Sequence, residues 1–420
     1  MSTEYDVIII GAGAAGVGAA RRLAGTSLST LLIEASGRVG GRAFTHNISG
    51  MPLDLGCGWL HSAERNPWTQ IAEDSGFTVE RGAPAWREQY RDLGFTSAEQ
   101  EEAEKSWQEW RDRLEATPFA SDRASDALPQ DSRWKAYAQS LSGYVNGAAL
   151  ENLSIADYLA YDRAASENNW RLREGYGALV AASLRSIPLR LSTPVTAIDH
   201  GGRNVRIETR AGALSARAVI LTVSTNVLAS GAIRFKPALD AKLHAAACLP
   251  LGFANKFFLA VAENSPFEDE THLLGDPRKA ETGSYYIRPL GRPVIECFFG
   301  GPGARALERA GLDAAFELAR DELASLFGNV IRPSLKALTG MSWGMIDGIG
   351  GAYSHANPGE SRRRGELAAP LDEKLFFAGE ATHACDFSTA HGAYESGVRA
   401  AEEALAALNP RRKRNSVTGK

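Results

Sequence analysis

Three glycines near the start of the chain have the spacing of a phosphate-binding turn. Gly11, Gly13 and Gly16 follow an apolar run at residues 5–10 and precede an alanine-rich stretch with helical spacing. In such a turn the first glycine permits the bend, the second lets a pyrophosphate approach, and the third lets helix and strand pack closely. Glu34 ends the next apolar run, where it can bind both ribose hydroxyls. These residues predict a site for FAD or NAD, because an acid there disfavours the 2′-phosphate of NADP.

A second signal, GRVGGR at residues 37–42, favours a flavin over NAD. With this element the chain resembles the flavin-containing amine oxidases, the family of monoamine and polyamine oxidases. The resemblance implies that Arg42 meets the FAD phosphates. It extends over nearly the whole chain and implies further cofactor contacts from Ala14, Ala15, Ala35, Arg38, Gly40, Gly41, Gly56, Cys57, Gly58, Trp59, Val195, Trp343, Gly379, Glu380, Thr389 and Ala390.

Residue 352 predicts how FAD is attached. Ala352 stands where the mitochondrial monoamine oxidases carry the cysteine that bonds FAD covalently. Alanine has no nucleophile, so we expect noncovalent FAD. The resemblance also places the N-terminus of a helix that begins near Ala390 at the flavin C2 carbonyl, where it would stabilise the negative charge of the reduced cofactor.

Two polar side chains are candidates for roles beside the flavin. Lys256 lies within the apolar run GFANKFFL, where burial of a cation without a partner costs desolvation free energy. The resemblance implies a lysine that holds a water molecule against flavin N5; a strand-edge lysine that reaches solvent is the alternative. His61, in WLHSAERNP, would line the substrate cavity by the same resemblance, or would instead cap local backbone.

The resemblance places Trp343 and Tyr353 around the amine, with Trp343 beside the flavin and Tyr353 as one wall of an aromatic cage. Thr389 stands where a monoamine oxidase has its second cage tyrosine, which is closer to the pattern of polyamine oxidases and histone demethylases. A diamine or polyamine would also need carboxylates for its remote cation. The acidic residues available for this are Glu64, Asp269 and Glu270.

The resemblance therefore implies an FAD-dependent amine oxidase. Hydride would pass from the carbon next to an uncharged amine to flavin N5, the imine would hydrolyse, and O2 would reoxidise the flavin, giving H2O2. Apolar and aromatic walls favour the uncharged amine because they penalise the ammonium form. The alternatives are an FAD-dependent desaturase or oxidase of a non-amine substrate, a redox-silent flavoprotein acting as a binding module, and an NAD-dependent dehydrogenase.

The pattern of elements predicts an α/β protein: a Rossmann-like βαβ FAD-binding domain with an inserted α+β substrate domain, as in the amine oxidases. Helical spacing covers residues 98–115, strand patterns cover about 189–222 and 374–379, and a last helix is expected at 392–408. We assign residues 1–85, 180–240 and 345–410 to the FAD-binding domain and residues 86–179 and 241–344 to the substrate domain. The basic tail at 411–420 is expected to be disordered.

The composition limits partners and location. The chain has 420 residues and a net charge of −4, which offers no general attraction to nucleic acid or to an anionic membrane. No apolar run approaches the roughly 20 residues of a membrane span, and no signal peptide is recognisable, so a cytoplasmic protein is expected. The four cysteines lie far apart without a CxxC pair, which predicts reduced thiols and no metal site. The amine, the electron acceptor and the oligomeric state stay open.

Overall fold

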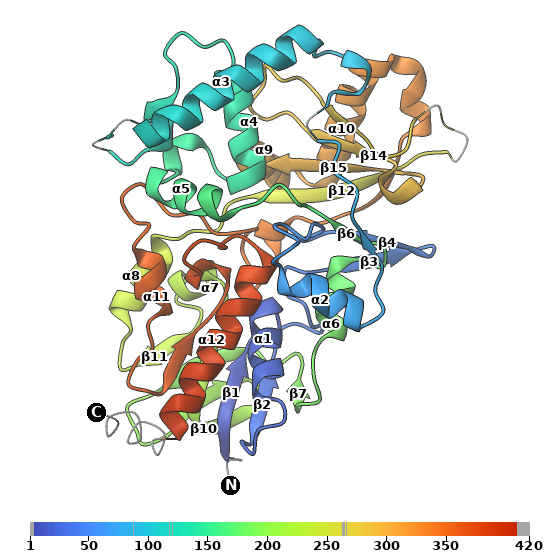
Figure 1. Cartoon of the computed structure of the whole chain (residues 1–420). Helices are drawn as coiled ribbons and strands as arrows, with labels where there is room; N and C mark the ends of the chain where they lie inside the picture. The colour runs from blue at the N-terminus through green and yellow to red at the C-terminus, as the bar shows by residue number, and fades with distance from the viewer. Residues whose placement is uncertain are drawn as a thin grey trace.

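The computed structural model describes residues 4–86, 88–116, 118–119, 121–262, 265 and 267–409. Most of its strands form two large sheets, the first in the lower half of Figure 1 and the second in the upper half, each covered by helices, and the strands β3 to β6 form two small two-stranded sheets. The predicted α/β fold is confirmed. The basic tail at 411–420 lies outside the described residues.

The first sheet is built from three stretches that are far apart in the sequence. Its central strand, β10 (Gly212–Leu221), pairs in parallel with β1 (Glu4–Ile10) on one side. On its other side, β10 pairs antiparallel with β9 (Val205–Thr209) and then in parallel with β17 (Leu375–Phe377). The carboxyl ends of β1, β10 and β17 therefore meet at one edge, where dinucleotides bind in open α/β sheets. The outer strands are β2 (Thr30–Ile33), β7 (Leu189–Arg190), β8 (Val195–Asp199) and β11 (Arg234–Lys236).

Both faces of the first sheet are buried. Val7 and Ile9 of β1 lie in one core with α1 and α12, whereas Ile8 and Ile10 lie in another with α7, α8 and α11. A strand covered on both faces needs a continuous apolar run, which is the pattern found at residues 5–10. These helices are α1 (Ala14–Leu23), α7 (Thr225–Ala229), α8 (Asp240–Ala247), α11 (Arg363–Ala368) and α12 (Ala390–Leu408).

The second sheet has one helix-covered face and one face turned toward the segment that follows residue 52. Phe257 packs with α9 (Gly301–Ala310) and α10 (Leu312–Phe327), whereas its neighbour Phe258 packs with Leu53 and Leu55. Lys256 shares the face of Phe258, because side chains alternate along a strand. In spatial order, the strands are β13 (Thr271–Leu274), β14 (Ser284–Ile287), β15 (Val294–Gly300), β12 (Ala254–Ala260) and β16 (Lys336–Gly340).

A helical segment lies beside the second sheet in Figure 1 and packs around the buried Trp110. It comprises α3 (Ser97–Ala116), α4 (Lys135–Asn146) and α5 (Ile155–Ala164). The helices predicted at 98–115 and 392–408 are confirmed as α3 and α12, and the strand predicted at 374–379 as β17. The shorter elements are α2 (Pro67–Asp74), α6 (Tyr176–Ala182), β3 (Thr45–Ile48), β4 (Met51–Asp54), β5 (Val79–Glu80) and β6 (Arg171–Leu172).

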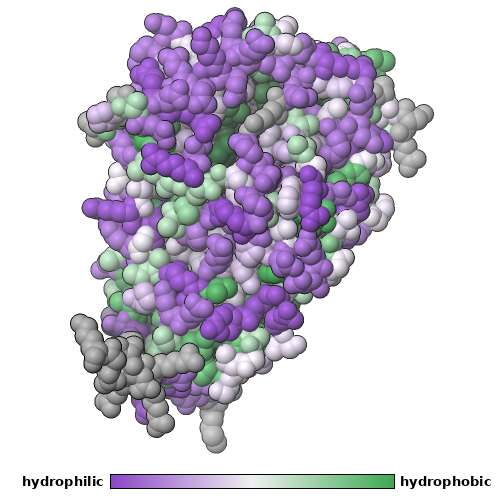
Figure 2. Space-filling model, in the orientation of Figure 1, coloured by the Kyte–Doolittle hydropathy of each residue, from purple (hydrophilic) through white to green (hydrophobic). Residues whose placement is uncertain are grey.

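The face of the molecule in Figure 2 is mainly hydrophilic, with a hollow in its upper half that is lined in part by hydrophobic residues. Among the described residues, no helix combines the length and the apolar character needed to cross a membrane. All four cysteines are free thiols.

Small residues let α12 lie directly against α1. A Cβ atom on Gly397 would overlap the carbonyl oxygen of Ala15. We expect Gly397→Ala to lower the free energy of unfolding by about 1–3 kcal/mol, measured by urea denaturation, because packed backbone must move. Gly365 in α11 is the matched control: its Cβ position meets no atom within 4 Å, so Gly365→Ala should stabilise by up to about 1 kcal/mol. Equal effects of the two changes would contradict this account.

Candidate active site

The glycine turn and the GRVGGR segment meet at the carboxyl end of β1. Gly13 is the N-cap of α1 and forms a bridge with Gly40, whose N–H donates to the Ala12 carbonyl at 2.8 Å. Cβ atoms at Gly11 and Gly16 would collide with neighbouring atoms, whereas the Cβ position of Gly13 is 3.8 Å from its nearest neighbour. The N-terminus of α1 is therefore surrounded by glycine backbone without side chains, and its free N–H groups suit a phosphate.

Glu34 and Arg38 flank this turn. The Glu34 carboxylate accepts a hydrogen bond from the Ala12 N–H at 2.7 Å, which holds it beside the glycines. Arg38 donates to the Gly41 carbonyl at 2.7 Å and so braces the GRVGGR loop. Other predicted cofactor contacts lie nearby: Ala14 and Ala15 in the first turn of α1, Ala35 directly after Glu34, and Val195 at the start of β8.

An ion pair joins the GRVGGR segment to the closing segment of the chain. Arg42 Nη1 lies 2.8 Å from Glu380 Oε1 and also donates to the Ala352 carbonyl at 2.5 Å. The Glu380 side chain is 5% exposed and accepts from the Ser354 hydroxyl at 2.6 Å. Burial alone would raise the pKa of Glu380, but the Arg42 charge and the Ser354 hydrogen bond outweigh it, and the net pKa is lowered. Glu380 is therefore an anion that fixes Arg42.

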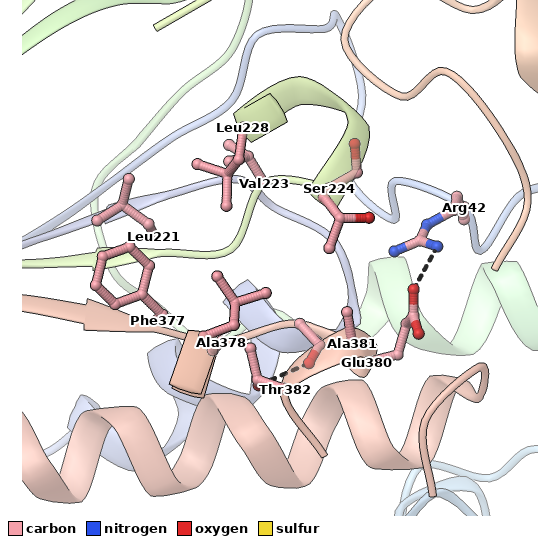
Figure 3. A pocket seen from close by; sticks show the side chains of 13 residues that line it. Arg42, Leu221, Val223, Ser224, Leu228, Phe377, Ala378, Glu380, Ala381 and Thr382 are labelled. Carbon is pink, nitrogen blue, oxygen red and sulfur yellow. Dashed lines mark hydrogen bonds and ion pairs between the residues drawn. The ribbon is translucent and has the colours of Figure 1, made fainter. Parts of the chain in front are cut away.

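A cavity lies beside this ion pair, at the carboxyl ends of β10 and β17 (Figure 3). Arg42 and Glu380 lie at one side of it and Leu221 at another. The hydroxyl of Thr225 is buried in the wall and has no hydrogen-bond partner within the described residues. Gly379 has a φ of +133°, and a Cβ there would meet no atom within 4 Å. A guanidinium, an unpaired hydroxyl and open backbone fit a phosphate-bearing cofactor.

The segment at residues 55–58 lies between Trp343 and the GRVGGR loop. The Trp343 indole N–H donates to the Leu55 carbonyl at 2.9 Å. A Cβ on Gly56 would overlap the carbonyl oxygen of Arg42, so this glycine permits the close approach of the two loops. Burial raises the pKa of the Cys57 thiol to about 12. The thiol is therefore protonated near neutral pH and is a poor nucleophile.

Lys256 points from β12 at the same segment. It is 8% exposed, and its Nζ lies 3.2 Å from Glu296 Oε1 on the adjacent strand β15. Nζ is also 2.9 Å from the Cβ position of Gly58, and the Asp54 side chain lies against that position from another side. Burial raises the pKa of Asp54. The alternative of a lysine that reaches solvent is wrong, because Lys256 is buried and paired.

Tyr353 is connected to the strand opposite Lys256 through Tyr144 and Phe298. Its hydroxyl donates a short hydrogen bond to the Tyr144 carbonyl, and burial raises the pKa of the phenol. The Tyr144 ring centre is 5.8 Å from that of Phe298, and Phe298 is the β15 residue opposite Lys256. Tyr353 is thus anchored at its hydroxyl, with its neighbours on the face of the second sheet that carries Lys256.

Thr389 acts as the N-cap of α12. Its hydroxyl accepts from the Gly392 N–H at 3.0 Å and donates to the Asp386 carbonyl at 2.6 Å. The Thr389 hydroxyl therefore bonds to backbone groups of the protein on both its donor and its acceptor side, which holds it at the start of the helix. Ala390 is the first residue of the helix, and its carbonyl accepts the Trp68 indole N–H at 3.1 Å.

Trp59 and His61 belong to an aromatic cluster that sequence reasoning missed. The ring centre of Trp59 lies 4.5 Å from that of Trp86 and 5.8 Å from that of Tyr286, and His61 stacks on Trp86 at 6.4 Å. The guanidinium of Arg171 lies 4.7 Å from the Trp59 ring and 4.8 Å from the Tyr286 ring. Three parts of the chain contribute to this cluster, so no local motif could have indicated it.

Comparison with known proteins decides the family. Residues 66–405 match the family described as flavin containing amine oxidoreductase, and residues 9–75 match an NAD(P)-binding Rossmann-like domain. The chain belongs to the flavin-containing amine oxidoreductase family. Family membership implies FAD as the cofactor and an oxidoreductase acting on amine CH–NH groups, and the desaturase, NAD-dependent dehydrogenase and redox-silent alternatives are not favoured.

Relatives and solved structures agree with this assignment. Polyamine oxidase 3 of Oryza sativa subsp. japonica is 28% identical, over 95% of this chain and 88% of its own. Polyamine oxidase 2 of Arabidopsis thaliana is 27% identical, over 95% of this chain and 87% of its own. The structure of wild-type putrescine oxidase bound to putrescine is 19% identical and shares the fold, with a TM-score of 0.75 over 97% of this chain and 100% of that one.

In this amine oxidase, two of the three acids considered for a remote substrate cation are paired with arginines. Glu270 pairs with Arg171, and Asp269 pairs with Arg288. Glu64 instead accepts hydrogen bonds from side chains of the loop at residues 166–168. Among the residues that the structure describes, Glu64 is the one of these three acids without an ion pair to an arginine.

A group of possible metal ligands lies before α12 in the amine oxidase. In the part of the chain that the structure describes, His383, Cys385 and Asp386 offer ligand atoms within 4.8 Å of one another. Their atoms already have partners: His383 Nδ1 accepts from the Asp386 N–H at 2.8 Å, and the Asp386 carboxylate pairs with Arg65 at 2.5 Å. We assign no metal to this group.

Buried histidines predict that the amine oxidase loses stability in acid. Burial lowers the pKa of His61, His272 and His355 from 6.5 to about 4. Between these values the unfolded chain binds more protons than the native one, so the free energy of unfolding should fall as the pH drops from 6.5 to 4. Urea denaturation across this window measures the slope. His272→Gln should make the slope shallower, and an unchanged slope would refute the assignment.

Proposed function

We propose that this protein oxidises a small amine with noncovalently bound FAD and delivers the electrons to O2, giving H2O2. Bound FAD would supply the acceptor, at N5, for hydride from the carbon next to the amine nitrogen. The proposal rests on one observation. Arg42, with its partner Glu380, and Lys256 come from distant parts of the chain and both approach the segment at residues 55–58.

Each part of the site has a task that its geometry supports. The bare backbone at Gly13 and the Arg42 guanidinium would hold the pyrophosphate. Trp343 and Tyr353 would wall the amine site and favour the uncharged amine, because apolar surroundings penalise the ammonium form. Lys256, oriented by its ion pair with Glu296, would hold a water molecule that assists the reduction of O2.

Two more residues complete the proposed site. His61 is neutral at physiological pH, because burial lowers its pKa to about 4, and would line the amine cavity as a hydrogen-bonding group without charge. Thr389 caps α12 and so fixes the N-terminus of this helix. That N-terminus would stabilise negative charge on the reduced cofactor at its C2 carbonyl.

The domain assignment stays a proposal that the two sheets support. Strands of the first sheet come from residues 4–33, 189–236 and 375–377, which fall within the segments proposed to bind FAD, and those of the second from residues 254–340. The helix α8 begins at Asp240 and packs with the first sheet, so the first domain extends past the boundary assigned at residue 240. The cytoplasmic location stays a prediction.

An anaerobic titration tests the function. The relatives are named as polyamine and putrescine oxidases, so putrescine and spermidine are the first probes, with benzylamine as an aromatic monoamine. We expect at least one amine to bleach the flavin absorbance, and air to restore the colour with release of H2O2. A bound flavin that no amine bleaches would favour the desaturase or the binding module.

Noncovalent attachment is tested separately. Ala352 offers no nucleophile, and its carbonyl accepts from Arg42. We expect acid precipitation to release all of the flavin into the supernatant. Yellow colour that stays with the precipitate would show a covalent bond and would contradict the prediction.

A further inference from the structure

A buried ion pair joins the helical segment to the closing part of the chain. Arg364 of α11 binds Asp157 of α5 through two hydrogen bonds, Nε to Oδ1 at 2.6 Å and Nη2 to Oδ2 at 2.8 Å. The two side chains are 4% and 1% exposed. Asp157 Oδ2 also accepts from the Ala356 N–H at 2.9 Å. Each of these two buried charges is stabilised by the other, because neither can be solvated by water.

The ion pair continues into the proposed cofactor pocket. Arg364 Nη1 donates to Ser354 Oγ at 2.9 Å and to the Ala381 carbonyl at 3.3 Å. The Ser354 hydroxyl then donates to Glu380 Oε2 at 2.6 Å, and Glu380 Oε1 lies 2.8 Å from Arg42 Nη1. An unbroken polar chain therefore runs from α5 to the arginine that lines the cavity in Figure 3.

Charges alternate along this chain: Asp157 is negative, Arg364 positive, Glu380 negative and Arg42 positive. If Asp157 lost its charge, one carboxylate would be shared between two guanidiniums. Glu380 would then be drawn toward Arg364 and away from Arg42, because Ser354 already links them. The segment at residues 352–356 would be held less firmly at the same time, since the Asp157 carboxylate accepts a hydrogen bond from the Ala356 N–H.

We propose that Asp157 and Arg364 are positioning residues that couple the docking of α5 to FAD binding. The inference rests on the proposed function only in that FAD is the ligand, and it requires no amine turnover. Coupling of this kind is reciprocal: if docked α5 tightens FAD binding, then bound FAD must protect α5 from opening by the same factor.

Asp157→Asn tests the coupling in the full chain, with Asp162→Asn as the control. Asp162 lies on the same helix, in a more exposed ion pair with Arg111. Titration of the apoprotein with FAD, followed by fluorescence, should give a Kd about tenfold weaker for Asp157→Asn and unchanged for Asp162→Asn. An Asp157→Asn value within about twofold of the wild type would overturn the proposal.

Hydrogen exchange distinguishes coupling from a merely structural role, because a structural role alone would not change the effect of FAD on amide exchange in α5. In the wild type, FAD should slow amide exchange in α5, and in Asp157→Asn this extra protection should be absent. An equal gain of protection in both proteins would overturn the proposal. Failure of the wild type to bind FAD would instead refute the proposed function.

Ser354→Ala serves as a second variant, because it breaks the chain while the Asp157–Arg364 pair stays intact. We expect it to weaken FAD binding and to remove the FAD-dependent protection of α5. Wild-type affinity and wild-type protection in Ser354→Ala would overturn the proposal even if Asp157→Asn did not fold.

Discussion

Replacing Lys256 with methionine should leave FAD bound and slow the reoxidation of the reduced enzyme by O2 about a hundredfold, the effect typical of losing one preorganised charged or hydrogen-bonding group. The physical reason is that Lys256 is the cation on the buried face of β12 that points at residues 56–58. Stopped-flow mixing of the reduced protein with oxygenated buffer measures the rate. The rate of reduction by amine should change much less.

The matched control separates chemistry from folding. Lys256→Met alone leaves the partly buried Glu296, whose side chain is 18% exposed, without its partner and should cost about 1–3 kcal/mol of stability. The double change Lys256→Met with Glu296→Gln should recover most of this stability and keep the slow reoxidation. A double variant that reoxidised at the wild-type rate would remove Lys256 from the proposed mechanism.

Replacing Arg42 with methionine should abolish FAD retention during purification, with an affinity at least about a hundredfold weaker. Arg42 has two roles in the structure: it lines the cavity at the carboxyl ends of β10 and β17, and it balances the charge of the buried Glu380. The variant loses a phosphate partner and leaves an uncompensated carboxylate, so the apoprotein should also unfold at lower urea concentration.

Arg65→Met is the matched control for this prediction. Arg65 pairs with Asp386, and that carboxylate is 5% exposed, as is Glu380. Both variants should therefore lose similar stability, but Arg65→Met should keep its FAD because Arg65 is not part of the cavity wall. Equal loss of FAD in the two variants would mean that Arg42 acts through stability alone.

Local chemistry made the cofactor site predictable. A phosphate-binding turn needs glycines at fixed short spacings, and a strand buried on both faces needs a continuous apolar run, so residues 5–16 could be interpreted without the fold. The helical spacing at residues 392–408 is likewise a pattern of residues that are close together in the sequence, so this helix could also be predicted without the fold. Arg42 and Glu380 were each found within their own motif, but nothing in either motif indicated that the two residues pair with each other.

The partners of the predicted residues depended on tertiary structure. Glu296 meets Lys256 because β12 and β15 pair in one particular register, and a shift by one residue would turn Glu296 to the other face. Asp157 meets Arg364 because α5 docks on the closing segment, 207 residues away along the chain. The aromatic cluster around Trp59 and the pairing of Glu270 with Arg171 arise in the same manner.

The sequence by itself therefore determined which chemical groups this protein has and that they form a dinucleotide site, because turns, strands and helices follow from residues that are close neighbours along the chain. The choice of FAD over NAD depended on the resemblance to the amine oxidases. Only the tertiary structure decided which charges neutralise each other. Ion pairing in a buried site depends on distances of a few ångströms between elements that the sequence keeps far apart, and those distances are set by strand register and helix docking.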